Sequence, residues 1–437
     1  MYDDNFTTPV AYETGLVVSE NLTGLDTTVG ATVDATVTRR AAASDVTFTL
    51  QWIQNLEECV EDGSHAEWTD LPAPTEVENE NGTTSYVWSD LQDMTGSVEK
   101  GFVRLYTTTP CDTVGAYSLV QGWEMVTHEG DLQTEGVPML NQAIYTGMID
   151  SNSEATLLLD SSTNGDNVAD SMGGTTTYYL EITSGDYEGH RFDLAEGGVD
   201  TVTIDTASVY NTASEIPDLS GSHYVIRAHH TIGSLYRNDE YTQGYTQSAG
   251  DQIHVYNATG FDIYYNNLAG EWIEVDDRLN GNDVIIPPGV GVFVKHAEED
   301  SINEELRVGE VRYNSFIRPL VRNKTGLNHI AMGYPVDCSP DMLSMRKEKG
   351  FSNNFSQSGA DQIRTWDGDH KGNRNTKGYT TFSHNLTDKW YSIDDKDTDR
   401  TEDTLFSLGR SPFIEVKDDV LEWKHEMPYS CEGWTQP

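Results

Sequence analysis

The chain has 437 residues, and 72 Asp and Glu against 27 Lys and Arg give it a net charge of −45. So acidic a surface repels phosphate backbones and anionic headgroups, which argues against nucleic acid and anionic membranes as partners. Hydrophobic residues make up 36%, which is low for a globular protein, but aromatic residues make up 10%, which argues against a disordered chain. Its many Thr, Tyr, Val and Gly residues favour strands and turns over helices.

Residues 1–27 are polar and rich in Thr, and we expect an extended N-terminal arm that adds a strand to a neighbouring chain. An intramolecular first strand is the alternative. Between 28 and 125, polar and apolar residues alternate in 46–53, where Val46, Phe48, Leu50 and Trp52 face one side. Further strand candidates lie at 33–40, 68–71, 83–88 and 102–106. This spacing predicts a β-sandwich module over 28–125.

Residues 126–300 form a second predicted β-rich module, with strand candidates at 176–182, 189–194 and 199–204. Residues 301–437 form a third, set off by the acidic stretch 297–300. Helix signals are scarce, and the best short candidate is 340–347. The predicted fold class is therefore all-β and multidomain, made of antiparallel sandwich-like modules.

One pattern is written twice in the second half of the chain. The segment 248–253 recurs as 358–363, and farther on Trp272 and Phe293 recur as Trp390 and Phe413. The offset between the copies grows from 110 to 118 to 120, so the second copy carries inserted loop residues. We place the first copy in 126–300 and the second in 301–437. Duplicated modules are typical of repeat architectures and do not themselves name a reaction.

Four cysteines lie as one pair in each half of the chain, at Cys59, Cys111, Cys338 and Cys431. Three pairings are possible from the sequence. We favour the local one, Cys59 with Cys111 and Cys338 with Cys431, with four free thiols as the alternative. No Cys-x-x-Cys occurs, so the spacing does not resemble a zinc site.

Asn-x-Ser/Thr sequons mark seven possible glycosylation sites, at Asn5, Asn21, Asn81, Asn257, Asn323, Asn354 and Asn385. They favour an extracellular or cell-surface protein. The sequence has no apolar run of the roughly 18 residues that span a bilayer. The first residues, from Met1 onward, are acidic and do not resemble a signal peptide. This feature disagrees with the export that the sequons favour.

Calcium is the expected ligand if the chain binds a metal, since clustered carboxylate and amide oxygens suit it. The candidate clusters contain Asp160, Asn164 and Asp166, and Asp394, Asp395 and Asp397. None has the spacing of an EF-hand, and solvent-exposed turns are the alternative interpretation. We expect no other cofactor.

Three segments in chain order, 184–193, 250–253 and 284–289, resemble an uncharacterised conserved β-rich domain of exported verrucomicrobial surface proteins. The resemblance covers 140–300, with the second copy matching more loosely over 305–420. It implies an exported, surface-associated β-protein and brings no catalytic or binding residues with it.

These observations predict a non-enzymatic extracellular structural protein. It would be a self-assembling subunit of a filament, fibre or surface layer, held by sheet edges or a donor arm. The sequence contains no Gly-x-Ser-x-Gly, no His-Glu-x-x-His and no phosphate-binding loop that would indicate an enzyme. A monomeric adhesin or carbohydrate-binding protein is the first alternative. A viral or phage structural protein and an acidic secreted hydrolase are the others.

Overall fold

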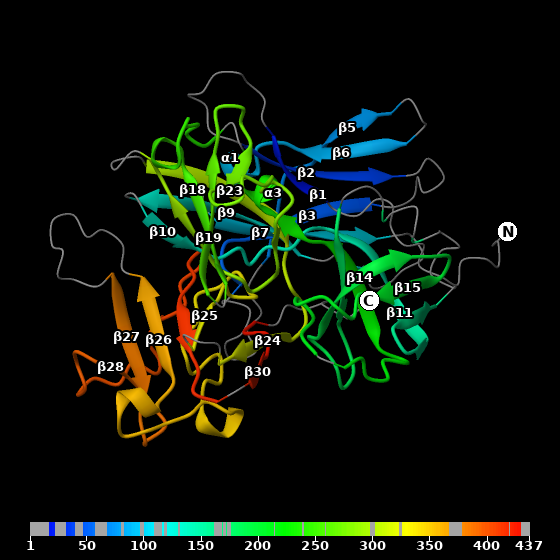
Figure 1. Ribbon diagram of the computed structural model, residues 1–437. Coiled ribbons are helices and arrows are strands. Elements are labelled where there is room, and N and C mark those ends of the chain that lie inside the picture. Colours follow the sequence, from blue (N-terminus) through cyan, green and yellow to red (C-terminus); the bar gives the residue numbers. More distant parts are fainter. Residues whose placement is uncertain are drawn as a thin grey trace.

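The structure is a computed structural model, and every structural statement below concerns the residues that it describes. These are 17–21, 32–39, 47–56, 68–79, 83–96, 100–108, 116–117, 120–129, 132–160, 168, 172, 176–213, 215–237, 240–257, 259–297, 302–322, 326–366, 378–418 and 420–429. Nearly all regular structure among them is β, in antiparallel sheets (Figure 1). The predicted all-β, multidomain class is confirmed.

The N-terminal part of the chain builds a β-sandwich. Its first sheet consists, in order, of β1 (Val17–Asn21), β2 (Thr32–Arg39), β6 (Thr84–Trp88) and β5 (Thr75–Glu78). The second consists of β23 (Ile302–Glu310), β9 (Gln121–Glu129), β7 (Lys100–Thr108), β3 (Thr47–Ile53) and β4 (Thr69–Asp70), with β8 (Ala116–Tyr117) beside β7. Side chains of both sheets meet in one core that includes Trp88 and Trp123. Phe48, Leu50 and Trp52 of β3 all contribute to it, as their alternation predicts.

Two strands join this sandwich from segments that the sequence assigns elsewhere. β1 lies inside 1–27, where we expect an arm, and it pairs with β2 of the same chain. The rest of the predicted arm lies outside the described residues. β23 begins just after the boundary that we place at 301, and it pairs with β9 along its whole length. The chain therefore returns to the N-terminal sandwich before it enters the second repeat copy.

A closed barrel occupies residues 143–228. Its strands, in order around the barrel, are β11 (Ala143–Ser153), β12 (Thr156–Leu159), β15 (Thr201–Ile204), β14 (Arg191–Gly197), β13 (Tyr178–Ile182) and β16 (His223–Ala228). Apolar side chains such as Leu157, Phe192 and Ile226 fill the interior. All residues of β13 are buried, because its outer face carries Glu181 against Arg312 of another segment.

The two repeat copies form two sheets with the same strand order. The first is β10 (Leu132–Glu135), β22 (Val292–Lys295), β18 (Gln252–Asn257), β19 (Gly260–Asn266) and β20 (Trp272–Glu274). The second is β25 (Leu327–His329), β29 (Phe413–Glu415), β26 (Gln362–Trp366), β27 (Tyr379–His384) and β28 (Trp390–Ser392). A short 3-10 helix precedes the central hairpin of each copy: η4 (Gln247–Ala249) in the first and η6 (Gln357–Gly359) in the second. The barrel is inserted in the first copy, between β10 and β18.

Short elements connect these units. β24 (Phe316–Val321) and β30 (Val420–His425) pair in a two-stranded ribbon that shares a core with the second copy. β17 (His230–Thr231) pairs with β21 (Ile285–Ile286). Besides η4 and η6, the helical elements among the described residues are α1 (Leu91–Met94), α3 (Ile232–Leu235) and the 3-10 helix η5 (Lys347–Lys349). The short helix that we expect at 340–347 is wrong. Residues 340–346 form turns and irregular backbone that place Leu343 and Met345 in the core, and a 3-10 helix begins only at Lys347.

Contacts between the two copies occur in matched pairs, as in a two-fold symmetric dimer. Gly136, after β10, donates its N–H to Gly409 O of the second copy at 3.1 Å. Ala331, after β25, donates its N–H to Gly289 O of the first copy, also at 3.1 Å. A Cβ on Gly136 would lie 2.9 Å from Arg410 O, so the close approach of the copies requires glycine there. The duplicated sequence thus folds into two sheets related by a pseudo-two-fold axis.

Candidate interaction surface

Most residues that recur between the copies hold the fold. Asp251 accepts hydrogen bonds from the backbone N–H groups of Ala297, at 2.7 Å, and Thr242, at 2.9 Å. Asp361 accepts the equivalent pair, each at 2.8 Å. These carboxylates fasten the start of the central strand to the chain on either side of it. Their recurrence is explained by the backbone that they hold.

The recurring tryptophans have the same kind of role. Trp272 and Trp390 are fully buried, and each indole N–H donates to a backbone carbonyl that precedes the central strand of its sheet. The acceptor is Tyr236 O at 2.7 Å in the first copy and Met345 O at 2.9 Å in the second. A buried indole needs such a partner, so these tryptophans anchor a core and are not a binding platform.

A second set of recurring residues is exposed. Tyr245 is 84% exposed and Phe355 is 91% exposed, and the two occupy the same position in the two copies. The same holds for Leu268, at 61%, and Leu386, at 60%. We call Tyr245 with Leu268 the first tip and Phe355 with Leu386 the second tip. Exposed side chains hold no core together, so the fold does not account for this recurrence.

Backbone contacts bring the two residues of each tip together. In the first copy Gly244 donates its N–H to Asn266 O at 2.9 Å, which places Tyr245 beside the turn that carries Leu268. In the second copy Asn354 donates its N–H to His384 O at 3.1 Å, next to the turn of Leu386.

Asx turns fix the loops that carry the two leucines. The side-chain oxygen of Asn267 accepts the N–H of Ala269 at 2.7 Å. That of Asn385 accepts the N–H of Thr387 at 2.9 Å. Both tips are therefore held by the same short-range interactions.

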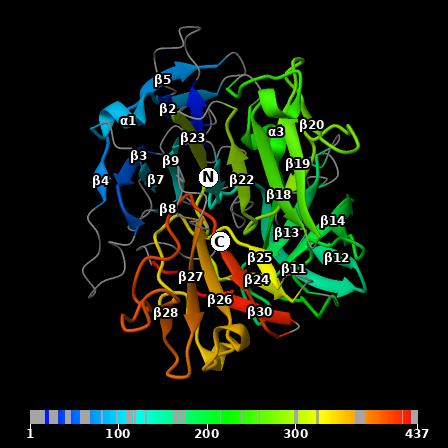
Figure 2. The ribbon, with the colours of Figure 1, turned by 60° about the vertical axis from the view of Figure 1, so that its left-hand side comes forward.

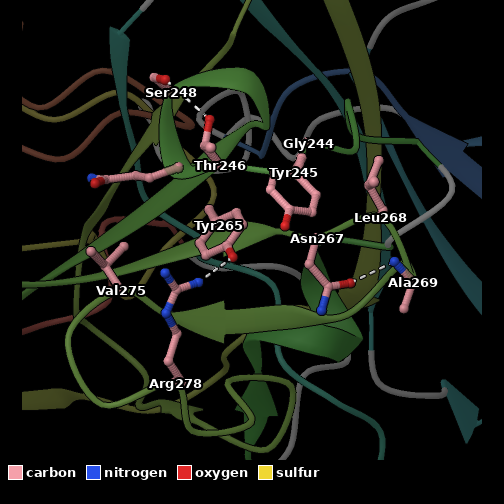
Figure 3. Close-up of a pocket in the computed structure, with 11 residues that line it drawn as sticks. Gly244, Tyr245, Thr246, Ser248, Tyr265, Asn267, Leu268, Ala269, Val275 and Arg278 are labelled. Atoms are coloured by element: carbon pink, nitrogen blue, oxygen red, sulfur yellow. Dashed lines mark hydrogen bonds between the residues drawn. The ribbon is translucent and has the colours of Figure 1, made fainter.

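An open cleft of about 780 Å³ lies at the first tip (Figure 3). Tyr245, Tyr265 and Leu268 line it, together with Gln247, Asn267 and other small or polar residues. Arg278 lies across from Tyr265, donates to its hydroxyl at 2.6 Å, and is the one charged residue in the lining. The cleft is thus an aromatic surface edged by amide and hydroxyl groups.

The loops that carry the aromatic residues of the two tips contain no charged side chains. Residues 242–250 and 352–360, which carry Tyr245 and Phe355, contain no Asp, Glu, Lys or Arg. On a chain of net charge −45, most other surfaces would repel a second molecule of this protein. The loops of Tyr245 and Phe355 therefore present exposed apolar groups without a carboxylate of their own, whereas the turns of Leu268 and Leu386 include Glu271 and Asp388.

The predicted calcium ligands do not form a metal site among the described residues. Asp394, Asp395 and Asp397 lie in a turn, where Asp395 accepts N–H groups from Asp397 and Thr398 and pairs with Arg400 at 3.2 Å. Asp160 follows β12, and its proposed partners Asn164 and Asp166 lie outside the described residues. Within the described ranges no three His, Cys, Asp or Glu side chains gather closely enough to hold a metal ion.

The structure places one of the four cysteines. Cys338 is fully buried in the core under the second copy, with its sulfur 3.6 Å from Val336 O. Cys59, Cys111 and Cys431 lie outside the described residues, so the pairing that we favour stays a prediction.

Three of the seven sequons have described side chains. The side-chain oxygens of Asn257, Asn354 and Asn385 each accept hydrogen bonds from the Ser or Thr of their own sequon. Asn354 is exposed and directly precedes Phe355, and Asn385 directly precedes Leu386. Asn21 ends β1, and Asn5, Asn81 and Asn323 lie outside the described residues. Two potential glycosylation sites therefore adjoin the second tip.

The tip residues are not among those predicted from the sequence, although the sequence contains a signal for them. The offset of 110 that relates the two Asp-Gln-Ile segments also places Tyr245 on Phe355, and the offset of 118 places Leu268 on Leu386. Sequence alone does not say which recurring aromatic residues are buried. Trp272 with Trp390 and Tyr245 with Phe355 recur alike, and their exposure in the structure separates the two pairs.

In the described part of the chain, no helix is both long and apolar enough to cross a membrane. The chain matches no model of a known protein family, and comparisons with curated proteins and with solved structures find no match either.

Proposed function

We propose that this is a non-enzymatic structural protein whose molecules associate with one another through the first and second tips. The observation that carries the proposal is the recurrence of an exposed aromatic residue and an exposed leucine at matched positions of the two copies. Buried aromatic side chains supply much of the binding energy at protein interfaces. A residue pair that recurs without a role in the fold is best explained by a contact made outside it.

The arrangement of the tips suits a chain of subunits. The first tip includes the β19–β20 turn and the second the β27–β28 turn. In Figure 2, β19 and β20 lie at the upper right and β27 and β28 at the lower left. Two separated patches let each molecule contact two neighbouring molecules. A contact from the first tip of one molecule to the second tip of the next is heterologous. Such contacts give an open polymer unless the rotation that relates successive molecules closes a ring. A filament, fibre or layer subunit at the cell surface or outside the cell fits this geometry.

Charge sets the condition for association. At a net charge of −45 each, two molecules of the protein repel each other unless salt or cations screen their surfaces. The Debye length falls from about 30 Å at 0.01 M to about 3 Å at 1 M salt. At high salt the apolar contacts of the tips are therefore no longer opposed by long-range repulsion between the acidic surfaces around them.

The test is self-association of the double variant Tyr245→Ser/Phe355→Ser against wild type in 1 M NaCl, measured by sedimentation velocity. Val209→Ser is the matched control, because Val209 is 87% exposed and belongs to neither tip. We expect concentration-dependent larger species for wild type and Val209→Ser, and a monomer for the double variant. A wild type that stays monomeric at all concentrations, or a double variant that associates as wild type does, contradicts the proposal.

One observation favours a second candidate, the binding of a carbohydrate at the first tip. Tyr245 stands exposed beside the amides of Gln247 and Asn267, a combination that stacks on a sugar face and bonds its hydroxyls. Glycan binding by a monodisperse monomer, lost in Tyr245→Ser and kept in Phe355→Ser, would favour this candidate over self-association.

A further inference from the structure

Two arginines meet at the turn between β21 and β22 without a carboxylate partner. Arg191, the first residue of β14, is 4% exposed and donates to Pro288 O at 2.7 Å. Arg318 of β24 lies at the next residue of the same turn, where a Cβ on Gly289 would be 3.4 Å from Arg318 Cδ. In the part of the chain that the structure describes, neither arginine forms an ion pair.

The inner nitrogens of both guanidinium groups lack a hydrogen-bond acceptor. Nε of Arg191 and Nε of Arg318 are buried, and no protein group among the described residues accepts from either. Arg318 as a whole is half-buried, and none of its donors forms a hydrogen bond to a described residue. An unpaired buried cation is costly, because burial removes the water that would solvate it.

No neighbouring carboxylate among the described residues forms an ion pair with either arginine. Arg312 also packs on the Phe316 ring beside Arg191, but its charge is met by Glu181. Two further carboxylates in this region are engaged elsewhere: Asp193 bonds His229, and Glu188 bonds the backbone N–H of Ser315. The local balance around Phe316 is therefore positive, on a protein that is otherwise strongly acidic.

The pKa values agree with this picture. Burial, together with the smaller effect of the nearby Arg191, lowers the pKa of Arg318 to about 9. Burial also lowers the pKa of Arg191 to about 10, against the attraction of Tyr179 and Asp193. Both shifts have the direction expected of cations that lack counter-charge.

We propose that Arg191 and Arg318 bind a small inorganic anion, chloride or an oxyanion such as phosphate. The unused Nε–H of each arginine donates to it, and Arg318 gives it access from solvent. The bound anion links the barrel, through β14, to the ribbon, through β24. These two elements already touch, since Ile317 N donates to Gly189 O at 3.3 Å. Guanidinium groups are well suited to bind such anions.

The test compares thermal unfolding of wild type, Arg318→Gln and Arg322→Gln. Arg322 is the matched control, because it is an exposed arginine just beyond the same strand. Each protein is melted in sodium gluconate, chloride and phosphate at equal ionic strength, so that general screening affects all three alike. Arg318→Gln removes an unpaired charge, so it should fold and be at least as stable as wild type in gluconate.

We expect wild type and Arg322→Gln to gain roughly 3 °C or more in Tm from gluconate to the bound anion, and Arg318→Gln to gain little. A gain in chloride identifies a halide site, and a gain in phosphate alone identifies an oxyanion site. Equal Tm changes in all three proteins would overturn the proposal, as would Arg318→Gln being much less stable than wild type in gluconate.

Discussion

Phe293 and Phe413 occupy the same position in the two copies, and their ring centroids lie 6.1 Å apart where the copies meet. The surrounding contacts come in pairs: Tyr256 meets Phe413 at 5.2 Å and 88°, and its counterpart Trp366 meets Phe293 at 5.5 Å and 88°. The second-copy sheet therefore packs on the first as one subunit of a symmetric dimer packs on the other. The pseudo-two-fold axis passes between these two phenylalanines.

Removing either ring should destabilise both copies at once. Phe293 and Phe413 are each 3% exposed, and replacing a buried Phe by Ala typically costs about 3–5 kcal/mol. Because the rings share one cluster, we expect the double variant Phe293→Ala/Phe413→Ala to lose less than the sum, with a coupling of roughly 0.5–3 kcal/mol. Urea unfolding of the single and double variants measures the coupling. Phe192→Ala in the barrel core, combined with Phe293→Ala, is the control and should be additive.

Acid should weaken the same cluster through His329, which stacks on Phe413 at 4.2 Å. Burial lowers the pKa of His329 to about 3, well below the usual value near 6.5. The unfolded chain then binds a proton that the folded chain rejects, so the free energy of unfolding falls as pH drops from 6.5. We expect a loss of about 2 kcal/mol between pH 6.5 and 5 from this one residue.

Urea unfolding of His329→Asn at several pH values tests this expectation. The variant should be less stable at pH 7.5 and should show a shallower loss toward pH 5 than wild type. His223→Asn, at a half-buried histidine of the barrel, is the control. An unchanged pH dependence in His329→Asn would contradict the prediction.

The two matched aspartates should titrate far apart. Burial raises the pKa of Asp361 to about 6, and the negative Asp418 adds to the rise against two backbone hydrogen bonds. Burial also raises the pKa of Asp251, but hydrogen bonds, first among them that from His296, bring it below the usual value. NMR of 13C-labelled aspartate should show one carboxyl near pH 6, absent in Asp361→Asn. Titration of every aspartate below about pH 4.5 would contradict this assignment.

Glycosylation should interfere with association at the second tip. A glycan on Asn354 or Asn385 would lie beside Phe355 or Leu386, whereas Asn257 lies at the other end of its hairpin. We expect protein from a glycosylating host to associate less than unglycosylated protein, and Asn354→Gln/Asn385→Gln to restore association. Light scattering in 1 M NaCl measures this, with Asn257→Gln as the control that restores nothing. Equal association with and without glycans at Asn354 and Asn385 would contradict the prediction.

Local pattern was enough to predict much of the fold. The alternation around Leu50 predicts β3 and its buried face, and the recurring segments predict two equivalent sheets. These features depend on the two-residue period of strands and on the order of residues. Both are present in the sequence itself.

What the sequence could not supply depends on contacts between distant segments. The pairing of β23 with β9 joins residues far apart in the chain, and no local signal assigns it to the N-terminal sandwich. Arg318 reads as an ordinary surface arginine until β24 is placed against the turn at Gly289. The tips also required the structure, since Tyr245 and Trp272 differ in exposure and not in how they recur.

Hydroxyl-radical footprinting of Tyr245 and Phe355 tests the central claim most directly. Oxidation of each residue is compared between low salt, where acidic surfaces repel, and 1 M NaCl, where copies associate, with exposed Met94 of the N-terminal sandwich as the internal reference. We predict that both tips lose reactivity together as larger species form, while Met94 does not change. Association that leaves Tyr245 and Phe355 as reactive as in the monomer would contradict the claim that the tips join one molecule to the next.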